Sequence, residues 1–170
     1  FRRVFAALDP GQFQACFVSW VQSLVGATDG KLVAVDGKTV RHSFAGEEGK
    51  GPLHLVSAWV GENQAVLGQL ATDSKSNEIT AIPQLLELLD LRGATVTIDA
   101  MGCQKAIAEK IIDAGADYIL ALKDNHPTLH QEVVQFFEAA QAETFRDTRC
   151  DQDETVDGGH GRIELRRVFA

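Results

Sequence analysis

Two aspartates stand at the ends of short apolar segments that are typical of buried strands. Asp36 follows Leu32-Val33-Ala34-Val35, and Asp99 follows Thr95-Val96-Thr97-Ile98. Asp is a poor strand residue, and burying a carboxylate without a partner is unfavourable. Two such carboxylates on one sheet indicate a metal site, because oxygen ligands suit a hard cation such as Mg²⁺ or Mn²⁺. The alternative is that each Asp caps the glycine-containing turn after its strand, at Gly37 and at Ala100-Met101-Gly102.

Hydrophobic periodicity predicts the elements that must position these acids. Asp9-Pro10 is typical of a helix start, with Asp as the N-cap and Pro in the first turn. The predicted helices cover residues 10–25, about 79–90 and 103–114, and a fourth begins at Pro127. The predicted strands cover residues 31–36, 53–60, 65–71, 95–99 and 118–122, and residues 162–168 alternate as a strand does.

The apolar stripes of the predicted helices indicate which side chains should face a core. They are Phe13, Phe17, Trp20, Val21 and Leu24; Ile79, Ile82, Leu85, Leu86 and Leu89; Ile107, Ile111 and Ile112; and Leu129, Val133, Phe136 and Phe137.

The order of these elements predicts an α/β fold. An antiparallel opening of three strands followed by alternating strands and helices is the plan of an RNase H-like mixed sheet flanked by helices. Periodicity supports the α/β class and does not by itself choose this plan over other mixed sheets. The expected organisation is an N-terminal helical segment, residues 1–30, that leads into an RNase H-like core, residues 31–170.

Composition bounds the class of protein. The chain has 170 residues, 45% hydrophobic and 24% charged, as expected of a globular domain. No apolar run approaches the roughly 20 residues that span a bilayer, so no membrane partner is expected. Three scattered cysteines fit a reducing cytoplasm. A net charge of −8 argues against a surface that coats nucleic acid generally, but not against an enzyme that grips it locally.

Several motifs together carry a resemblance to a known family. They are Val33-Ala34-Val35-Asp36-Gly37-Lys38-Thr39-Val40-Arg41, Thr72-Asp73-Ser74-Lys75-Ser76-Asn77-Glu78-Ile79, Thr97-Ile98-Asp99-Ala100-Met101-Gly102-Cys103-Gln104, Ala121-Leu122-Lys123-Asp124-Asn125 and Gly159-His160-Gly161-Arg162-Ile163-Glu164. With these motifs in this order, nearly the whole chain resembles the bacterial insertion-sequence transposases that include the H-repeat-associated proteins of Rhs elements.

The resemblance implies a DDE-type catalytic domain that uses Mg²⁺ or Mn²⁺ to cut and join DNA at transposon ends. Asp36 and Asp99 would be the first two acids and the metal ligands. In this family the catalytic Glu is expected in a motif of the kind HWxIENxLHW, which does not occur before Ala170. The chain is therefore expected to be truncated before that acid, and Glu164 is the best acid within it.

Basic side chains near these acids are candidate contacts with DNA phosphate. Lys38 and Arg41 follow the first acid, Lys123 ends a later strand, and Lys75 precedes a helix start, where backbone N–H groups bind anions. The alternatives are simple solvation and capping. The expected partners are transposon-end DNA and target DNA. A homodimer is one possible assembly of the full-length transposase.

Two other functions remain open at this point. One is an RNase H-like nuclease with the same metal chemistry. The other is an inactive or repurposed transposase remnant that acts as an interaction module. A phosphate loop is excluded because Leu32 stands where its first glycine should be, and no GxGxxG follows a strand.

Overall fold

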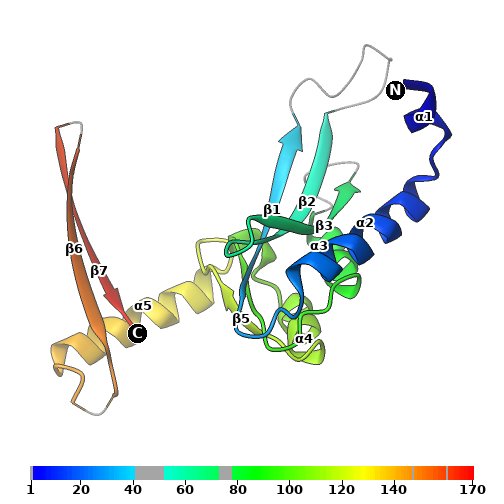
Figure 1. Cartoon of the computed structure of the whole chain (residues 1–170). Coiled ribbons are helices and arrows are strands. Elements are labelled where there is room, and N and C mark those ends of the chain that lie inside the picture. The colour runs from blue at the N-terminus through cyan, green and yellow to red at the C-terminus, as the bar shows by residue number, and fades with distance from the viewer. Residues whose placement is uncertain (1, 41–51, 73–77, 147, 160) are drawn as a thin grey trace. The chain divides into compact units, whose positions relative to one another are not determined.

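The chain forms two compact units, residues 1–125 and residues 126–170. The computed structural model describes residues 2–40, 52–72, 78–146, 148–159 and 161–170 (Figure 1). The first unit holds the sheet that carries both aspartates. Its elements are α1 (Arg2–Ala7), α2 (Pro10–Val25), β1 (Leu32–Val40), β2 (Leu53–Val60), β3 (Ala65–Thr72), α3 (Glu78–Glu87), β4 (Thr95–Ile98), the 3₁₀ helix η2 (Ala100–Gly102), α4 (Lys105–Asp113) and β5 (Asp117–Leu120).

The sheet of the first unit is mixed, with the strand order β3-β2-β1-β4-β5. Strands β1, β2 and β3 pair antiparallel, whereas β1–β4 and β4–β5 pair parallel. Strands β2 and β3 form the predicted hairpin across residues 61–64. This order and these directions confirm the predicted RNase H-like fold.

One face of this sheet is covered by helices α2, α3 and α4, which are seen together in Figure 1. The core lies between them. Its fully buried side chains include Val33, Val56, Val60 and Val96 from the sheet and Leu85, Leu86, Ile107 and Ile111 from the helices. Because side chains alternate along a strand, the neighbouring residues of β1 face away from this core.

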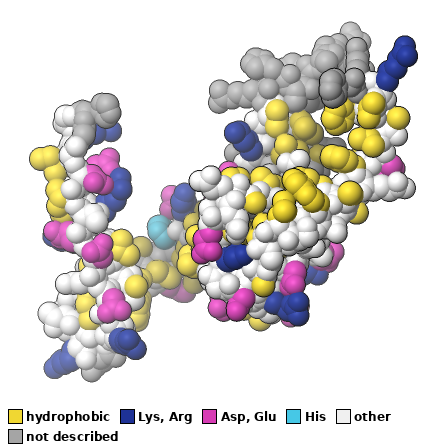
Figure 2. Space-filling model, viewed as in Figure 1, with side chains coloured by type: hydrophobic (Ala, Val, Ile, Leu, Met, Phe, Trp, Pro, Cys, Tyr) yellow, Lys and Arg dark blue, Asp and Glu magenta, His cyan; other side chains and the backbone are white. Residues whose placement is uncertain are grey.

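Helix α2 begins as predicted, because Asp9 accepts a hydrogen bond from the backbone N–H of Gln12 at 2.8 Å. Its buried residues are Val18, Val21 and Val25. The predicted inward stripe was wrong at Phe13, Trp20 and Leu24, which are exposed. Figure 2 shows hydrophobic side chains at the surface of the first unit on the face that it draws. The helix packs on β3 through its valine stripe. That stripe lies about 100° from the aromatic one, since successive helical residues are rotated by about that angle.

Strand β1 is longer than predicted. The sequence predicted a strand that ends at Asp36 and a turn at Gly37, but β1 continues to Val40. The reason is its antiparallel partner, since β2 pairs with β1 from Val33↔Val60 to Val40↔Leu53. Asp36 therefore stands inside β1.

The other predicted helices differ from the structure in detail. Helix α3 ends at Glu87 and α4 begins at Lys105, both inside their predicted ranges. Ile112, predicted to face inward, is exposed. None of the helices in the described ranges is long and apolar enough to cross a bilayer.

The second unit consists of α5 (Pro127–Ala142), β6 (Gln152–Gly159) and β7 (Arg162–Phe169). Strands β6 and β7 form an antiparallel hairpin, of which only β7 was predicted. Strand β6 was missed because its sequence is mostly polar, so backbone pairing rather than an apolar face defines it. No residue of α5 is buried, so the predicted inward stripe is wrong there, although Phe137 contacts Phe136 and Phe169.

Candidate active site

Asp36, inside β1, and Asp99, directly after β4, lie at the same level of two neighbouring parallel strands. The parallel pairing of β1 with β4 runs from Leu32↔Thr95 to Val35↔Ile98. The residue that follows this paired stretch in each chain segment is one of the two aspartates, Asp36 within β1 and Asp99 just after β4. Both aspartates are exposed. The structure thus brings together two acids that are far apart in the sequence.

The side chain of Asp36 lies on the face of the sheet opposite the helices. Its neighbours Val35 and Gly37 face the helices, and Val35 is buried in the core. Ser57 is its cross-strand partner on β2, and Ser57 in turn pairs with Gln69 on β3. A row of polar side chains therefore crosses the sheet at the level of Asp36.

Asp99 caps the turn that follows β4. Its Oδ1 accepts a hydrogen bond from the backbone N–H of Met101 at 3.1 Å, and it is the N-cap of η2. The capping role that the sequence left open is therefore real for this aspartate. Capping does not preclude metal binding, because an ionised carboxylate has two oxygens and about four acceptor positions.

The turn after Asp99 is held by a residue from the next loop. The side-chain amide of Asn125 donates to the carbonyl oxygen of Ala100 at 2.6 Å. The turn is also tight, since a Cβ on Gly102 would overlap a methyl carbon of Ile98. These contacts fix the backbone immediately after the second acid.

Another acidic residue, Glu78, packs on β1 next to Asp36, on the face of the sheet that the helices cover. Glu78 begins α3 and is only 7% exposed. Its carboxyl group packs on Gly37, so that a Cβ there would overlap Cδ of Glu78. The sequence placed Glu78 in a polar helix start and did not reveal this burial. The signal was hidden because Gly37 was predicted to lie in a turn; the structure places it inside β1, and a glycine inside a strand often marks a close approach of another group.

The structure describes three of the remaining predicted site residues, Lys38, Lys123 and Glu164. Lys38 and Lys123 are exposed, Lys38 on the same face of β1 as Asp36. Arg41 and Lys75 lie outside the described residues. Glu164 belongs to β7 in the second unit, where its carboxylate accepts a hydrogen bond from Arg166 at 2.5 Å. Across the described ranges, no group of three or more His, Cys, Asp or Glu is arranged to hold a metal.

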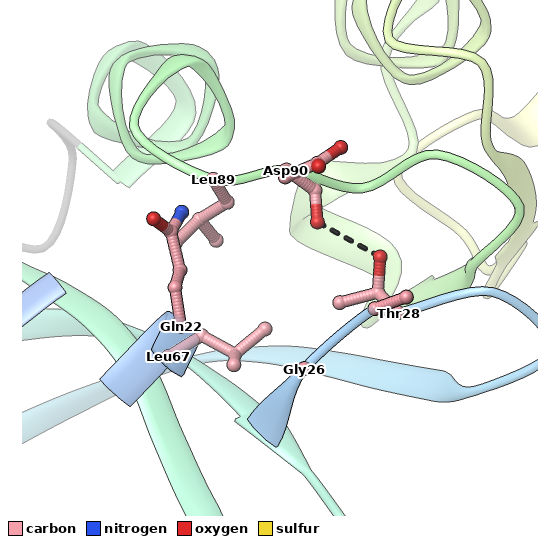
Figure 3. Close-up of a pocket in the computed structure, with 7 residues that line it drawn as sticks. Gln22, Gly26, Thr28, Leu67, Leu89 and Asp90 are labelled. Carbon is pink, nitrogen blue, oxygen red and sulfur yellow. Dashed lines mark hydrogen bonds between the residues drawn. The ribbon is translucent and has the colours of Figure 1, made fainter. Parts of the chain in front are cut away.

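A cavity of about 300 Å³ lies elsewhere in the first unit (Figure 3). Thr28 Oγ1 donates to the carbonyl oxygen of Asp90 at 2.8 Å beside it. Thr28 precedes β1 and Asp90 precedes β4, so this cavity lies near the N-terminal ends of these two strands. Asp36 and Asp99 lie farther along the two segments, toward the C-terminal ends. Its lining residues are Gln22, Gly26, Ala27, Thr28, Leu67, Leu89 and Asp90.

Comparison with known proteins gives the family of the chain. Residues 23–167 match the family described as the transposase DDE domain. The chain belongs to the DDE transposase family. This is the family type that the resemblance predicted, and the matched range includes Asp36 and Asp99.

Individual relatives support the same assignment. The chain is 48% identical over 164 residues to the putative transposase YncI of Escherichia coli K12, which covers 96% of this chain and 65% of the relative. It is 40% identical over 164 residues to the H repeat-associated putative transposase YhhI of the same organism, which covers 96% of this chain and 43% of the relative. The predicted resemblance to the H-repeat-associated transposases is confirmed.

A third relative carries no functional name. The chain is 48% identical over 170 residues to the "Uncharacterized protein in dhlA 3'region" of Xanthobacter autotrophicus, which covers 99% of this chain and 56% of the relative. The chain therefore spans 43% to 65% of the length of these relatives. A piggyBac transposase synaptic complex with hairpin DNA matches 58% of this chain and 24% of that chain at 10% identity, with a TM-score of 0.41. At this level of similarity, the match carries no argument about the fold or the function of this chain.

Proposed function

We propose that this DDE transposase chain provides two of the acids for metal-dependent cleavage and transfer of DNA strands at the ends of an insertion sequence. The observation that carries the proposal is the parallel register of β1 and β4, which sets Asp36 and Asp99 at one level of the sheet. The family assignment supplies the reaction class.

The donor set fits a hard divalent cation. Asp36 and Asp99 both offer exposed carboxylate oxygens, the ligands that Mg²⁺ and Mn²⁺ take in proteins. When bound, such ions activate the attacking oxygen and stabilise the leaving oxygen of an in-line displacement at phosphorus. Because both carboxylates are at the surface, waters and phosphate oxygens can complete the coordination.

The other residues proposed for the site either contact the DNA or supply the third acidic residue. Lys38 lies on the same face of β1 as Asp36 and is proposed to contact a DNA phosphate, as are Lys123, Arg41 and Lys75. Glu164 remains a candidate for the third acid within this chain. The relatives are longer than this chain, so residues outside it are the other source of that acid.

Substitution of the two acids in the full-length protein tests the proposal. Asp36→Asn and Asp99→Asn should each lower cleavage of transposon-end DNA at least about a hundredfold, because a metal ion contributes several kcal/mol of transition-state stabilisation. The matched control is Asp117→Asn, since Asp117 is an exposed aspartate that pairs with Thr95 at the start of β4. Cleavage retained in both acid variants would overturn the assignment.

The reaction products and the binding of Mn²⁺ distinguish a transposase from a nuclease and from an inactive remnant. A transposase should both cut and join transposon ends, whereas a nuclease should cut without joining. Isothermal titration with Mn²⁺ should give heat that disappears in Asp36→Asn. An inactive remnant should give neither cleavage nor Asp-dependent heat.

A further inference from the structure

Glu78 is the one buried carboxylate among the described residues of the first unit. Among the described residues, the buried polar side chains are those of Thr28, Thr72 and Glu78, and Glu78 alone of these three carries a charge when ionised. Burial of a carboxylate is costly unless its surroundings compensate. Its position in the first turn of α3 supplies part of that compensation through the helix dipole, but the dipole does not require burial against a strand.

The contact between Glu78 and β1 is unusually close. An ideal Cβ on Gly37 would overlap Cδ of Glu78 and would lie 2.5 and 2.6 Å from its two carboxylate oxygens. The carboxyl group therefore lies directly over the Cα of Gly37, at a place that any side chain would fill. Gly37 is consequently the residue that lets an acid approach the backbone here.

This contact is made immediately after Asp36. Gly37 lies on the face of β1 that the helices cover, whereas the side chain of Asp36 projects from the other face. The two carboxylates thus lie on opposite sides of one strand, at adjacent residues of the chain. Packing of Glu78 on Gly37 restricts the backbone that carries Asp36, and its negative charge favours a cation nearby.

We infer that Glu78 is a positioning residue for the proposed metal site: it acts through Gly37 on Asp36 and strengthens cation binding there. This inference rests on the proposed function. It assigns to Glu78 itself a role toward the metal rather than toward DNA phosphate. A negatively charged, buried group behind the first acid would repel phosphate but attract a divalent cation.

Isothermal titration of the chain with Mn²⁺ tests the inference without measuring catalysis. Glu78→Gln keeps the size of the side chain and removes its charge, so its Mn²⁺ affinity should fall by about threefold to tenfold. Glu62→Gln makes the same charge change in the exposed turn between β2 and β3 and should leave the affinity unchanged. Circular dichroism should show that both variants melt as folded proteins.

A second variant keeps the test decisive if Glu78→Gln does not fold. Glu78→Asp retains the charge on a shorter arm, so it should bind Mn²⁺ within about twofold of the wild type. Folded Glu78→Gln that binds like the wild type, or folded Glu78→Asp that loses binding altogether, would overturn the inference. If the wild type itself binds no Mn²⁺, the proposed metal site fails first and the inference fails with it.

Discussion

Asn125 holds the backbone of Ala100 through a hydrogen bond of 2.6 Å from its side-chain amide to the carbonyl oxygen. Ala100 directly follows Asp99, so a residue beyond β5 fixes the turn that begins at the second acid. Glu78 makes the corresponding contact after the first acid, at Gly37. Each aspartate is therefore followed by a backbone position that a distant polar side chain constrains.

Substitution of Asn125 should loosen the turn at Asp99. We expect Asn125→Ala to lower the free energy of unfolding by about 0.5–1.5 kcal/mol, the net contribution of one hydrogen bond. Hydrogen exchange at the backbone amide of Met101, which Asp99 caps, should become faster. Asn63→Ala in the exposed turn between β2 and β3 is the control, and unchanged protection of Met101 in Asn125→Ala would contradict the expectation.

Substitution of Gly37 should be destabilising because the space for a Cβ is taken by Glu78. We expect Gly37→Ala to lower the free energy of unfolding by up to about 1–3 kcal/mol, the cost of overpacking in a core, and by less where the flexible end of the Glu78 side chain moves aside. Urea denaturation measures this change. Gly61→Ala, at a glycine where an added Cβ would meet nothing within 4 Å, should alter it by less than about 0.5 kcal/mol.

The double variant Gly37→Ala/Glu78→Ala checks the cause. Removal of the Glu78 carboxyl group should relieve the clash, so the two substitutions should not be additive. Additive losses in the cycle would show that the destabilisation of Gly37→Ala has another origin.

Loss of the N-cap of α2 should destabilise the first unit. Asp9 accepts a hydrogen bond from the N–H of Gln12, and Asp9→Ala should lower the free energy of unfolding by about 1 kcal/mol. Asp9→Asn keeps an acceptor at the same position and should recover most of the loss. Thermal unfolding followed by circular dichroism measures both variants, and equal losses in the two would argue that the acceptor is not what matters.

The parts of the fold that were predicted depend on local signals. Asp9-Pro10 marks the start of α2, and the polar residues 61–64 between two apolar runs mark the hairpin of β2 and β3. The alignment of Asp36 with Asp99 across neighbouring strands is only a hypothesis from the sequence. It follows from the parallel register of two separate strands, which the local sequence does not contain.

The parts that were not predicted depend on contacts between distant segments. The burial of Glu78 arises from the packing of α3 on the sheet, and only the pairing of β2 with the second half of β1 carries that strand past Gly37. The orientation of α2 also depends on packing, because an aromatic stripe and a valine stripe compete and the valines face the sheet. The polar strand β6 exists through its pairing with β7 rather than through its own periodicity.

The ion pair between Asp90 and Arg92 should make the free energy of unfolding depend on pH in the acid range. Arg92 donates two hydrogen bonds to the carboxylate of Asp90, at 2.9 and 2.8 Å, and these hold the pKa of Asp90 below its ordinary value of 3.8. A carboxyl pKa that folding lowers contributes stability above the unfolded pKa, and this contribution is lost as pH falls through the folded pKa. The effect should be small because both side chains are more than half exposed, at 54% and 81%.

Direct titration of the Asp90 carboxyl group separates this ion pair from the other acids of the chain. Carbon-detected NMR should find a midpoint that rises toward 3.8 in Arg92→Gln, because that substitution removes the charge and the paired donors. Arg92→Lys keeps the charge without the planar pair of donors, so its midpoint should lie between the two. A midpoint that does not move in Arg92→Gln would show that the hydrogen bonds from Arg92 do not set it.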